Sequence, residues 1–236
     1  MTTPGAPVLE LSGVSKDYRG LRPLRIADLA VLPGENVAIL GLDQIAAEVF
    51  VNLVTGATLP DRGEVRLFGR STAAITDSAD WLAVVDRFGI VSRRAVLLEA
   101  LTVVQNLAMP FTLEIEPPPE DIRRQAVALA QRVGLSDATL DHPVSELGPS
   151  GHARVRLGRA LALDPAVVIL EHATAEIPRE DIAAFAILCR GLPSSAIAVT
   201  ADAEFAEAVA GRRLTLDPAT GRLHERSGWF SRLRRG

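Results

Sequence analysis

Two short polar segments, each placed after an apolar run, carry the side chains best suited to chemistry. Gln44–Glu48 comes shortly after the run Val37–Leu40, and the pair Glu171-His172 comes directly after the run Val167–Leu170. A glutamate carboxylate can reach a divalent cation such as Mg²⁺, and an imidazole is a competent general base near neutral pH. The second segment could therefore serve in metal binding or in proton transfer.

The segment Val37–Gly56 has the order of strand, tight loop and helix on which phosphate-binding loops are built. The N-terminus of such a helix offers free N–H groups and a partial positive charge. The loop also needs glycines that let the amides surround an anion, a lysine for the phosphates and a hydroxyl for magnesium. In those places this sequence has Gln44, Ala46, Ala47 and Glu48. The framework is present, and the residues that hold phosphate are replaced.

The composition is that of a globular protein with one well-buried core, or a core with a small subdomain. The chain has 236 residues, of which 48% are hydrophobic and 23% charged. A formal net charge of −4 argues against a nucleic-acid partner. Cys189 is the single cysteine, so no internal disulfide is expected and a cytoplasmic location fits. No apolar stretch approaches the ~18 residues of a membrane span, so any membrane contact is expected to be peripheral, at the inner face of the cell membrane, or through a partner.

The period of the apolar residues predicts strands that alternate with helices, which is typical of a parallel α/β sheet. Strands are expected at Val8–Val14, Leu24–Val31, Val37–Leu40, Glu64–Phe68, Phe88–Val91, Val167–Leu170, Ala196–Thr200 and Leu214–Leu216. Besides the helix that ends near Gly56, helices are expected at Ala79–Val84, Thr102–Met109, Glu120–Val133, Val155–Leu163, Asp181–Arg190 and Glu204–Ala210.

Several short sequence motifs occur in the order and at the spacing found in one known family. They are Pro33-Gly34-Glu35, Leu101-Thr102-Val103 with Asn106, Arg154-Val155 followed by Arg159-Ala160-Leu161, and Asp164-Pro165 before the second apolar run. From Val8 to Leu223 the chain resembles the ATP-binding subunit of ABC transporters. The resemblance implies an α/β fold with a P-loop NTPase-like parallel core sheet flanked by helices, an N-terminal antiparallel β subdomain and a helical subdomain.

The resemblance also implies a division of the chain. Residues 1–225 would form a single ABC ATP-binding-like domain, with the β subdomain at about 8–33 and 57–70, the core at about 34–56, 71–92 and 160–225, and the helical subdomain at about 93–159. Residues 226–236 would form a basic C-terminal tail with Trp229, Phe230 and Leu233 among its arginines. Such a tail could lie on an anionic membrane surface or on a partner subunit, or it could be a frayed end.

At the positions where the family binds nucleotide, this sequence departs from the family pattern. Gly41 remains, but Ala47 replaces the lysine, Glu48 replaces the magnesium-binding hydroxyl, and Gln44 and Ala46 replace two glycines. The other family positions hold Arg93 for the glutamine that senses magnesium, Gly148 and Ser150 within the altered signature Leu147–Gly151, Glu171 and His172 for the acidic pair, and Ala201 for the switch histidine.

Three family positions have an ordinary interpretation beside the functional one. Tyr18 stands where the family stacks an aromatic ring on adenine, but it could equally be a packed or half-exposed tyrosine of a turn. Arg93 could contact an anion, or it could be a solvated loop arginine. Glu171 could bind magnesium, or it could be a leftover acid at the end of a strand.

Each change in the phosphate loop makes the free energy of phosphate binding less favourable. Losing the lysine removes charge-assisted hydrogen bonds of roughly 1.5–3 kcal/mol each. The charge of Glu48 at ~4 Å from a phosphate charge costs about 4 kcal/mol at an effective dielectric constant of ~20. High-affinity triphosphate binding is therefore not expected, and neither ATP nor magnesium is expected as a cofactor.

The resemblance and the departures together predict a pseudo-ATPase. It would be a structural or regulatory partner of a membrane permease subunit, of a second ATP-binding-type subunit in a homo- or heterodimer, or of both. One alternative is an active transport ATPase that uses Glu171 and His172. Another is a binding module that uses the pocket around Gln44–Glu48 for a ligand that is not a nucleotide.

Overall fold

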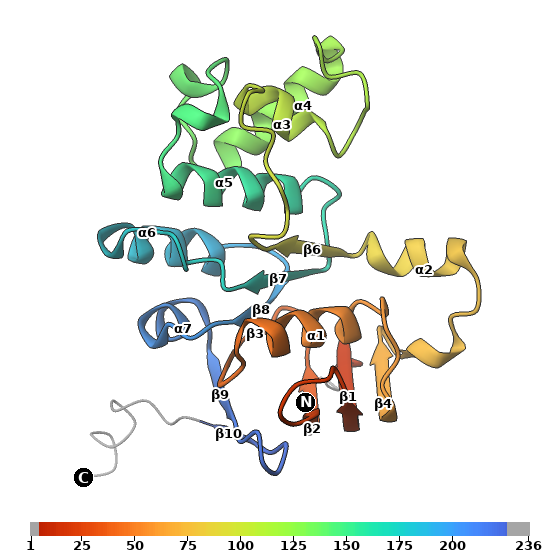
Figure 1. Ribbon diagram of the computed structural model, residues 1–236. Coiled ribbons are helices and arrows are strands. Elements are labelled where there is room, and N and C mark those ends of the chain that lie inside the picture. The colour runs from red at the N-terminus through yellow and green to blue at the C-terminus, as the bar shows by residue number, and fades with distance from the viewer. Residues whose placement is uncertain (1–4, 226–236) are drawn as a thin grey trace.

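The computed structural model describes residues 5–225 and contains two β-sheets with helices packed around them (Figure 1). The four-stranded sheet has the order β2-β1-β4-β5, and the six-stranded sheet has the order β10-β9-β3-β8-β7-β6. The fold class predicted from the sequence, with a mainly parallel core sheet, an antiparallel N-terminal sheet and a helical region, is confirmed.

The antiparallel sheet consists of β1 (Leu9–Lys16), β2 (Leu24–Val31), β4 (Arg62–Leu67) and the short β5 (Arg70–Ser71). One face of this sheet is buried and the other faces solvent, but the alternation along β2 changes phase, since Leu24 and Ile26 are buried and then Leu29 and Val31. In β1 the buried positions are Leu9, Leu11 and Val14. The pairing of β1 with β4 shifts its register between Ser12 and Ser15, which accounts for the change of phase in the buried positions of β1.

The six-stranded sheet consists of β3 (Asn36–Leu40), β6 (Phe88–Val91), β7 (Val167–Glu171), β8 (Ser195–Val199), β9 (Arg212–Leu216) and β10 (Leu223–Glu225). Strands β9, β3, β8, β7 and β6 are parallel, and β10 is antiparallel to β9. Strands β7 and β8 are buried along their whole length, because helices and the other sheet cover both faces. The carboxyl ends of the parallel strands therefore meet at one edge.

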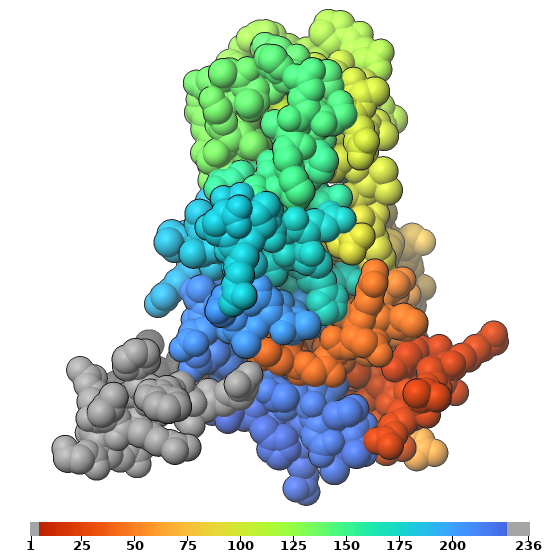
Figure 2. Space-filling view, turned by 60° about the vertical axis from the view of Figure 1, so that its left-hand side comes forward, coloured from red at the N-terminus to blue at the C-terminus, as the bar shows by residue number. Residues whose placement is uncertain are grey.

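The helices are α1 (Gln44–Val54), α2 (Ser78–Val85), α3 (Val103–Ala108), α4 (Glu120–Arg132), α5 (Pro149–Ala160), α6 (Arg179–Arg190) and α7 (Ala203–Val209), with short 3-10 turns at Thr72–Ala74, Asp137–Thr139 and Val144–Glu146. Figure 1 shows α3, α4 and α5 stacked at one end of the molecule, on the opposite side of β6 from the antiparallel sheet. In Figure 2 these green helices project from the rest of the molecule. Every helix within residues 5–225 is too short or too polar to cross a lipid bilayer.

Strand β3 separates two hydrophobic clusters. Its Val37 and Ile39 pack in a cluster with α1 and the antiparallel sheet, whereas Ala38 and Leu40 pack in a cluster with the helices α3 to α7. Alternate side chains of one strand point to opposite faces of the sheet, so both clusters fix the position of β3. The loop that follows β3 is consequently held from both sides.

Two predictions about the elements were wrong. Helix α5 begins at Pro149, not at Val155, because proline at the first helical position has a pre-set φ and needs no N–H partner there. Strand β9 is not the last strand, since Leu223–Glu225 pairs with Leu214–Leu216 as β10. The run Leu223–Glu225 has only three residues, which is too short to be recognised as a strand from the sequence.

Candidate functional site

The carboxyl edge of the parallel sheet brings together five of the residues singled out from the sequence. Gln44, Glu48, Arg93, Glu171 and His172 line a hollow of about 80 Å³, and the other lining residues are Ser92, Arg94 and Ala175. They come from α1, from the loop after β6 and from the segment after β7. This is the edge at which open α/β sheets bind ligands, but the hollow is well below the ~300 Å³ of a typical small-molecule site.

The loop between β3 and α1 is three residues long, because α1 begins at Gln44. Asp43 caps the helix, and its Oδ1 accepts a hydrogen bond of 2.7 Å from the backbone N–H of Ala46. Gln44 and Ala46 have helical backbone, and Ala47 is fully buried among core residues. The amide that would face an anion is thus satisfied by a carboxylate of the chain itself.

Gly41 has φ of +92°, and a Cβ atom added to it would lie 2.8 Å from the carbonyl oxygen of Leu216 in β9. Both the backbone conformation and the close approach of the neighbouring strand require glycine here. The glycine at the end of β3 therefore has a packing role that needs no bound phosphate.

Arg94 joins α1 to the end of β7. Its Nη1 lies 3.2 Å from Oε1 of Glu48, and its Nη2 donates a hydrogen bond of 2.8 Å to Oε2 of Glu171. The side chain of Glu171 is only 5% exposed. A guanidinium thus lies between the carboxylates at the two family positions for magnesium ligands.

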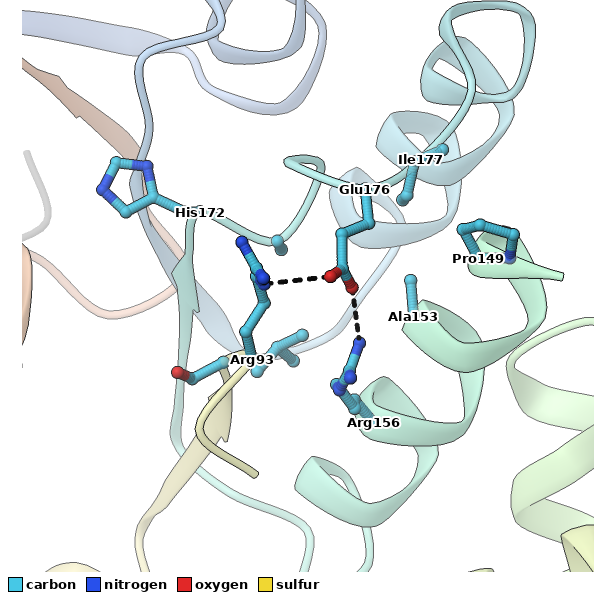
Figure 3. A pocket seen from close by; sticks show the side chains of 10 residues that line it. Arg93, Pro149, Ala153, Arg156, His172, Glu176 and Ile177 are labelled. Atoms are coloured by element: carbon cyan, nitrogen blue, oxygen red, sulfur yellow. Dashed lines mark ion pairs between the residues drawn. The ribbon is translucent and has the colours of Figure 1, made fainter. Parts of the chain in front are cut away.

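Arg93 belongs to a second ion-pair network (Figure 3). Its Nε lies 3.1 Å from Oε1 of Glu176, and Nη1 of Arg156 on α5 lies 3.5 Å from Oε2 of the same carboxylate. The Nε of Arg156 also donates a 3.4 Å hydrogen bond to the carbonyl of Ala95. Arg93 is therefore an ion-paired residue, and the network joins the loop after β6 to the helical region.

His172 follows β7 in a left-handed conformation with φ of +44°, and its backbone N–H donates to the carbonyl of Val199 at 2.8 Å. Its Nε2 is buried and has no hydrogen-bond partner among the described residues. In Figure 3 the ring points away from the pair Arg93 and Glu176. The imidazole lines the hollow, but no hydrogen bond to a carboxylate within residues 5–225 orients it as a base.

Ala201 follows β8 and offers no side-chain polar atom at the switch position. The neighbouring polar groups are used within the fold: the Oγ1 of Thr200 accepts from the N–H of Asp202, and Asp202 caps α7 by accepting from the N–H of Phe205. Nothing on this loop is directed at the hollow beside Glu171.

Gly148 and Ser150 lie at the start of α5, and neither lines the hollow beside Gln44. Gly148 is the N-cap residue, Pro149 lacks an N–H, and the Oγ of Ser150 donates to Oδ2 of Asp181 on α6. The start of α5 therefore presents a carboxylate, and the serine hydroxyl is already bound.

Tyr18 lies in the turn between β1 and β2. It is half-buried and packs against the cluster of the antiparallel sheet and α1. A Cβ atom on Gly20 would lie 2.5 Å from its ring, so the turn folds closely over the tyrosine. These contacts are those of a packed turn residue.

Sequence reasoning missed Arg94, Glu176 and Asp181. The only signal for Arg94 was its position beside Arg93 after an apolar strand. Within residues 5–225, no group of three or more histidine, cysteine, aspartate or glutamate side chains could hold a metal ion.

Solved structures show which fold the chain has. A dimeric structure of the bacterial ABC transporter cassette MJ0796 superposes with a TM-score of 0.75 at 22% identity and covers 94% of this chain and 100% of that chain. The structure of cbiO1 from Clostridium perfringens gives a TM-score of 0.76 at 18% identity and covers 93% of this chain and 87% of that chain. The fold is the ATP-binding-cassette fold of the P-loop NTPase class.

The family follows from the sequence comparison. The family model described as ABC transporter matches residues 24–175, and this chain belongs to that family. It is 28% identical over 216 residues to the methionine import ATP-binding protein MetN of Brucella abortus (strain 2308), covering 90% of this chain. It is 34% identical over 149 residues to the lipoprotein-releasing system ATP-binding protein LolD of Pseudomonas fluorescens, covering 63% of this chain and 65% of that protein. The resemblance found in the sequence is confirmed, and the chain spans 58% of the length of MetN.

Proposed function

We infer that this chain is an ABC-type subunit that acts without nucleotide hydrolysis. It serves as a structural or regulatory partner of a membrane permease subunit, with a second ATP-binding-type subunit or a second copy of itself. The observation that carries this proposal is the start of α1, where the helix itself replaces the phosphate-binding loop. We infer that the subunit is located at the cytoplasmic face of a membrane.

The start of α1 supports the proposal through charge and geometry. Asp43 accepts a hydrogen bond from the Ala46 N–H, and Glu48 is the fifth residue of α1, so two carboxylates flank the place of the β- and γ-phosphates. Each carboxylate at ~4 Å from a phosphate charge costs about 4 kcal/mol at an effective dielectric constant of ~20. Ala47 brings no positive charge to offset this repulsion, and the nearby guanidinium of Arg94 is shared between the carboxylates of Glu48 and Glu171.

Magnesium does not fit the residues present. Mg²⁺ requires oxygen ligands at ~2.0–2.1 Å in octahedral geometry, whereas an oxygen of Glu48 and an oxygen of Glu171 are in ion pairs with Arg94. A metal ion would have to displace the guanidinium from a carboxylate that is almost fully buried. The same pairing argues against the alternative of an ATPase that uses Glu171 and His172, since Glu171 would first have to leave Arg94.

The start of α5 supports a scaffold role over a shared active site. In this family two subunits face each other so that the signature segment of one completes the nucleotide site of the other. Here that segment presents Pro149 and the carboxylate of Asp181, with Ser150 already bound to it. A nucleotide held by a facing subunit would meet a negative charge without a serine donor.

The transport role rests on the relatives. MetN is named as a methionine import protein and LolD as part of a lipoprotein-releasing system. Both names describe systems that move a substrate, which supports a permease as the partner.

The test is a calorimetric titration of the purified chain with Mg-ATP, with thermal unfolding as a second readout. We expect no heat of binding and no shift in unfolding temperature up to millimolar ATP. The matched control is the variant Gln44→Gly/Ala46→Gly/Ala47→Lys/Glu48→Thr, which puts the family's residues back into the loop and should gain binding. Micromolar affinity in the unaltered chain would overturn the proposal.

A further inference from the structure

The contacts of Arg94 differ from those of an ordinary surface arginine. Its two Nη atoms reach different carboxylates, Glu48 on α1 at 3.2 Å and Glu171 at the end of β7 at 2.8 Å. The side chains of Arg94 and Glu48 are 40% and 47% exposed, whereas that of Glu171 is 5% exposed. A carboxylate buried to this degree is costly unless a cation or several donors accompany it.

The direction of Arg94 is set by the sheet. Val91, the last residue of β6, pairs with Leu170 of β7, so the chain leaves β6 beside Glu171. The buried Ser92 then accepts a hydrogen bond of 3.1 Å from the N–H of Arg94 through its Oγ. This turn directs the guanidinium across the carboxyl edge of the sheet toward α1.

We propose that Arg94 is a built-in cation that takes the place of a divalent metal at this edge and makes Glu48, Arg94 and Glu171 a permanent joint between α1, the loop after β6 and β7. The inference rests on the proposed function, because it describes the same site without nucleotide. A guanidinium has directed donors that can serve two carboxylates at once. Since it is covalently attached, its local concentration depends on neither metal nor ATP.

The consequence concerns regulation. In a site that needs a metal ion and a nucleotide, the relative positions of α1 and the loop after β6 respond to ligand. Here the ion pairs of Arg94 already connect α1, the loop after β6 and β7. The neighbouring ion pairs of Glu176 with Arg93 and Arg156 extend this connection to α5. The arrangement of core and helical region is therefore set by folding and does not follow ATP.

The first experiment compares the unfolding temperatures of Arg94→Gln, Arg94→Lys and a control. Arg94→Gln leaves the buried carboxylate of Glu171 without its cation and should lower the unfolding temperature by about 5 °C, which is less than the loss for a fully buried ion pair because the Arg94 side chain is 40% exposed. Arg94→Lys, which keeps the charge, should retain more than half of that stability. The control Arg179→Gln removes a well-exposed ion pair with Glu204 and should change the unfolding temperature by about 1 °C or less. An Arg94→Gln variant as stable as the control would overturn the inference.

The second experiment uses millimolar MgCl₂ without nucleotide. The unfolding temperature of the unaltered chain should not respond, whereas that of Arg94→Gln should rise, since a divalent ion then has both carboxylates available. The double variant Glu48→Gln/Arg94→Gln should lose this response. No rise in Arg94→Gln, or a rise of equal size in the unaltered chain, would show that the guanidinium does not take the metal's place.

The two proposals fail in different measurements. Mg-ATP binding by the unaltered chain would overturn the proposed function, whatever the behaviour of Arg94→Gln. Absence of that binding, together with full stability of Arg94→Gln, would leave the proposed function intact and remove the built-in cation.

Discussion

Replacing Gly41 with alanine tests why the loop between β3 and α1 needs a glycine. Gly41 has φ of +92°, and an added Cβ would lie 2.8 Å from the carbonyl oxygen and 3.4 Å from the nitrogen of Leu216. Both contacts are with the backbone of β9, which cannot rotate away as a side chain can. The structure therefore predicts that Gly41→Ala disturbs the junction between β3 and β9.

The expected loss has two parts. A left-handed backbone costs a residue with a Cβ about 1–2 kcal/mol, and forced overlap in a packed region costs about 1–3 kcal/mol. Their sum for Gly41→Ala is about 3 kcal/mol, which lowers the unfolding temperature of a domain of this size by about 6–12 °C.

Gly34→Ala is the matched control. Gly34 also has a positive φ, +74°, but nothing lies within 4 Å of its added Cβ. This variant should lose only the backbone part, about 1 kcal/mol or about 2–4 °C. Thermal and urea unfolding of both variants, followed by circular dichroism, give the difference directly.

Equal losses in the two variants would refute the argument that Leu216 makes Gly41 necessary. A larger loss in Gly41→Ala, measured without any nucleotide, would show that packing alone is a sufficient reason for this glycine. Gly41 is then no sign of phosphate binding.

Three further outcomes are expected. Asp43→Ala removes the cap on the Ala46 N–H and should cost about 1 kcal/mol, seen as a fall of about 2–4 °C in unfolding temperature; no change would contradict the capping role. Asn106→Leu leaves the N–H of Leu98 without its acceptor and removes the amide donor that serves the carbonyls of Leu98, Leu101 and Thr102, so it should cost about 2 kcal/mol in urea unfolding, whereas a loss below that of Asp43→Ala would count against this network. Burial raises the pKa of the Cys189 thiol from 9.0 to about 12, so the native thiol should resist alkylation at pH 8 until the protein unfolds. As the pH rises, the thiol of the unfolded chain ionises before the native thiol. The burial of neutral Cys189 therefore contributes its full stability below pH 9, and this contribution is lost as the pH rises toward 12. Rapid alkylation of the native protein would refute the burial of Cys189.

The sequence predicted most of the elements because their apolar periods are clear. The bounds of β2 and β6 agree with those expected, and α3, which Thr102 caps, lies within the helix expected at Thr102–Met109. The start of α5 was placed too late, since its first turn, Pro149–His152, carries no apolar stripe and is helical through proline geometry and tertiary contact.

The apolar periods of the sequence by themselves indicated an α/β fold with a parallel sheet, and the sequence shows that no lysine follows β3. The resemblance assigned Glu48, Arg93, Glu171 and His172 to positions of one nucleotide site. In the structure they meet at one edge, because parallel strands carry the residues that follow them to the same side of a sheet. Only the tertiary structure decided that Arg94, and not Arg93, lies between the two glutamates. That choice depends on the local turn at Ser92 and on the register of β6 against β7, which is a long-range pairing; neither has a period along the chain.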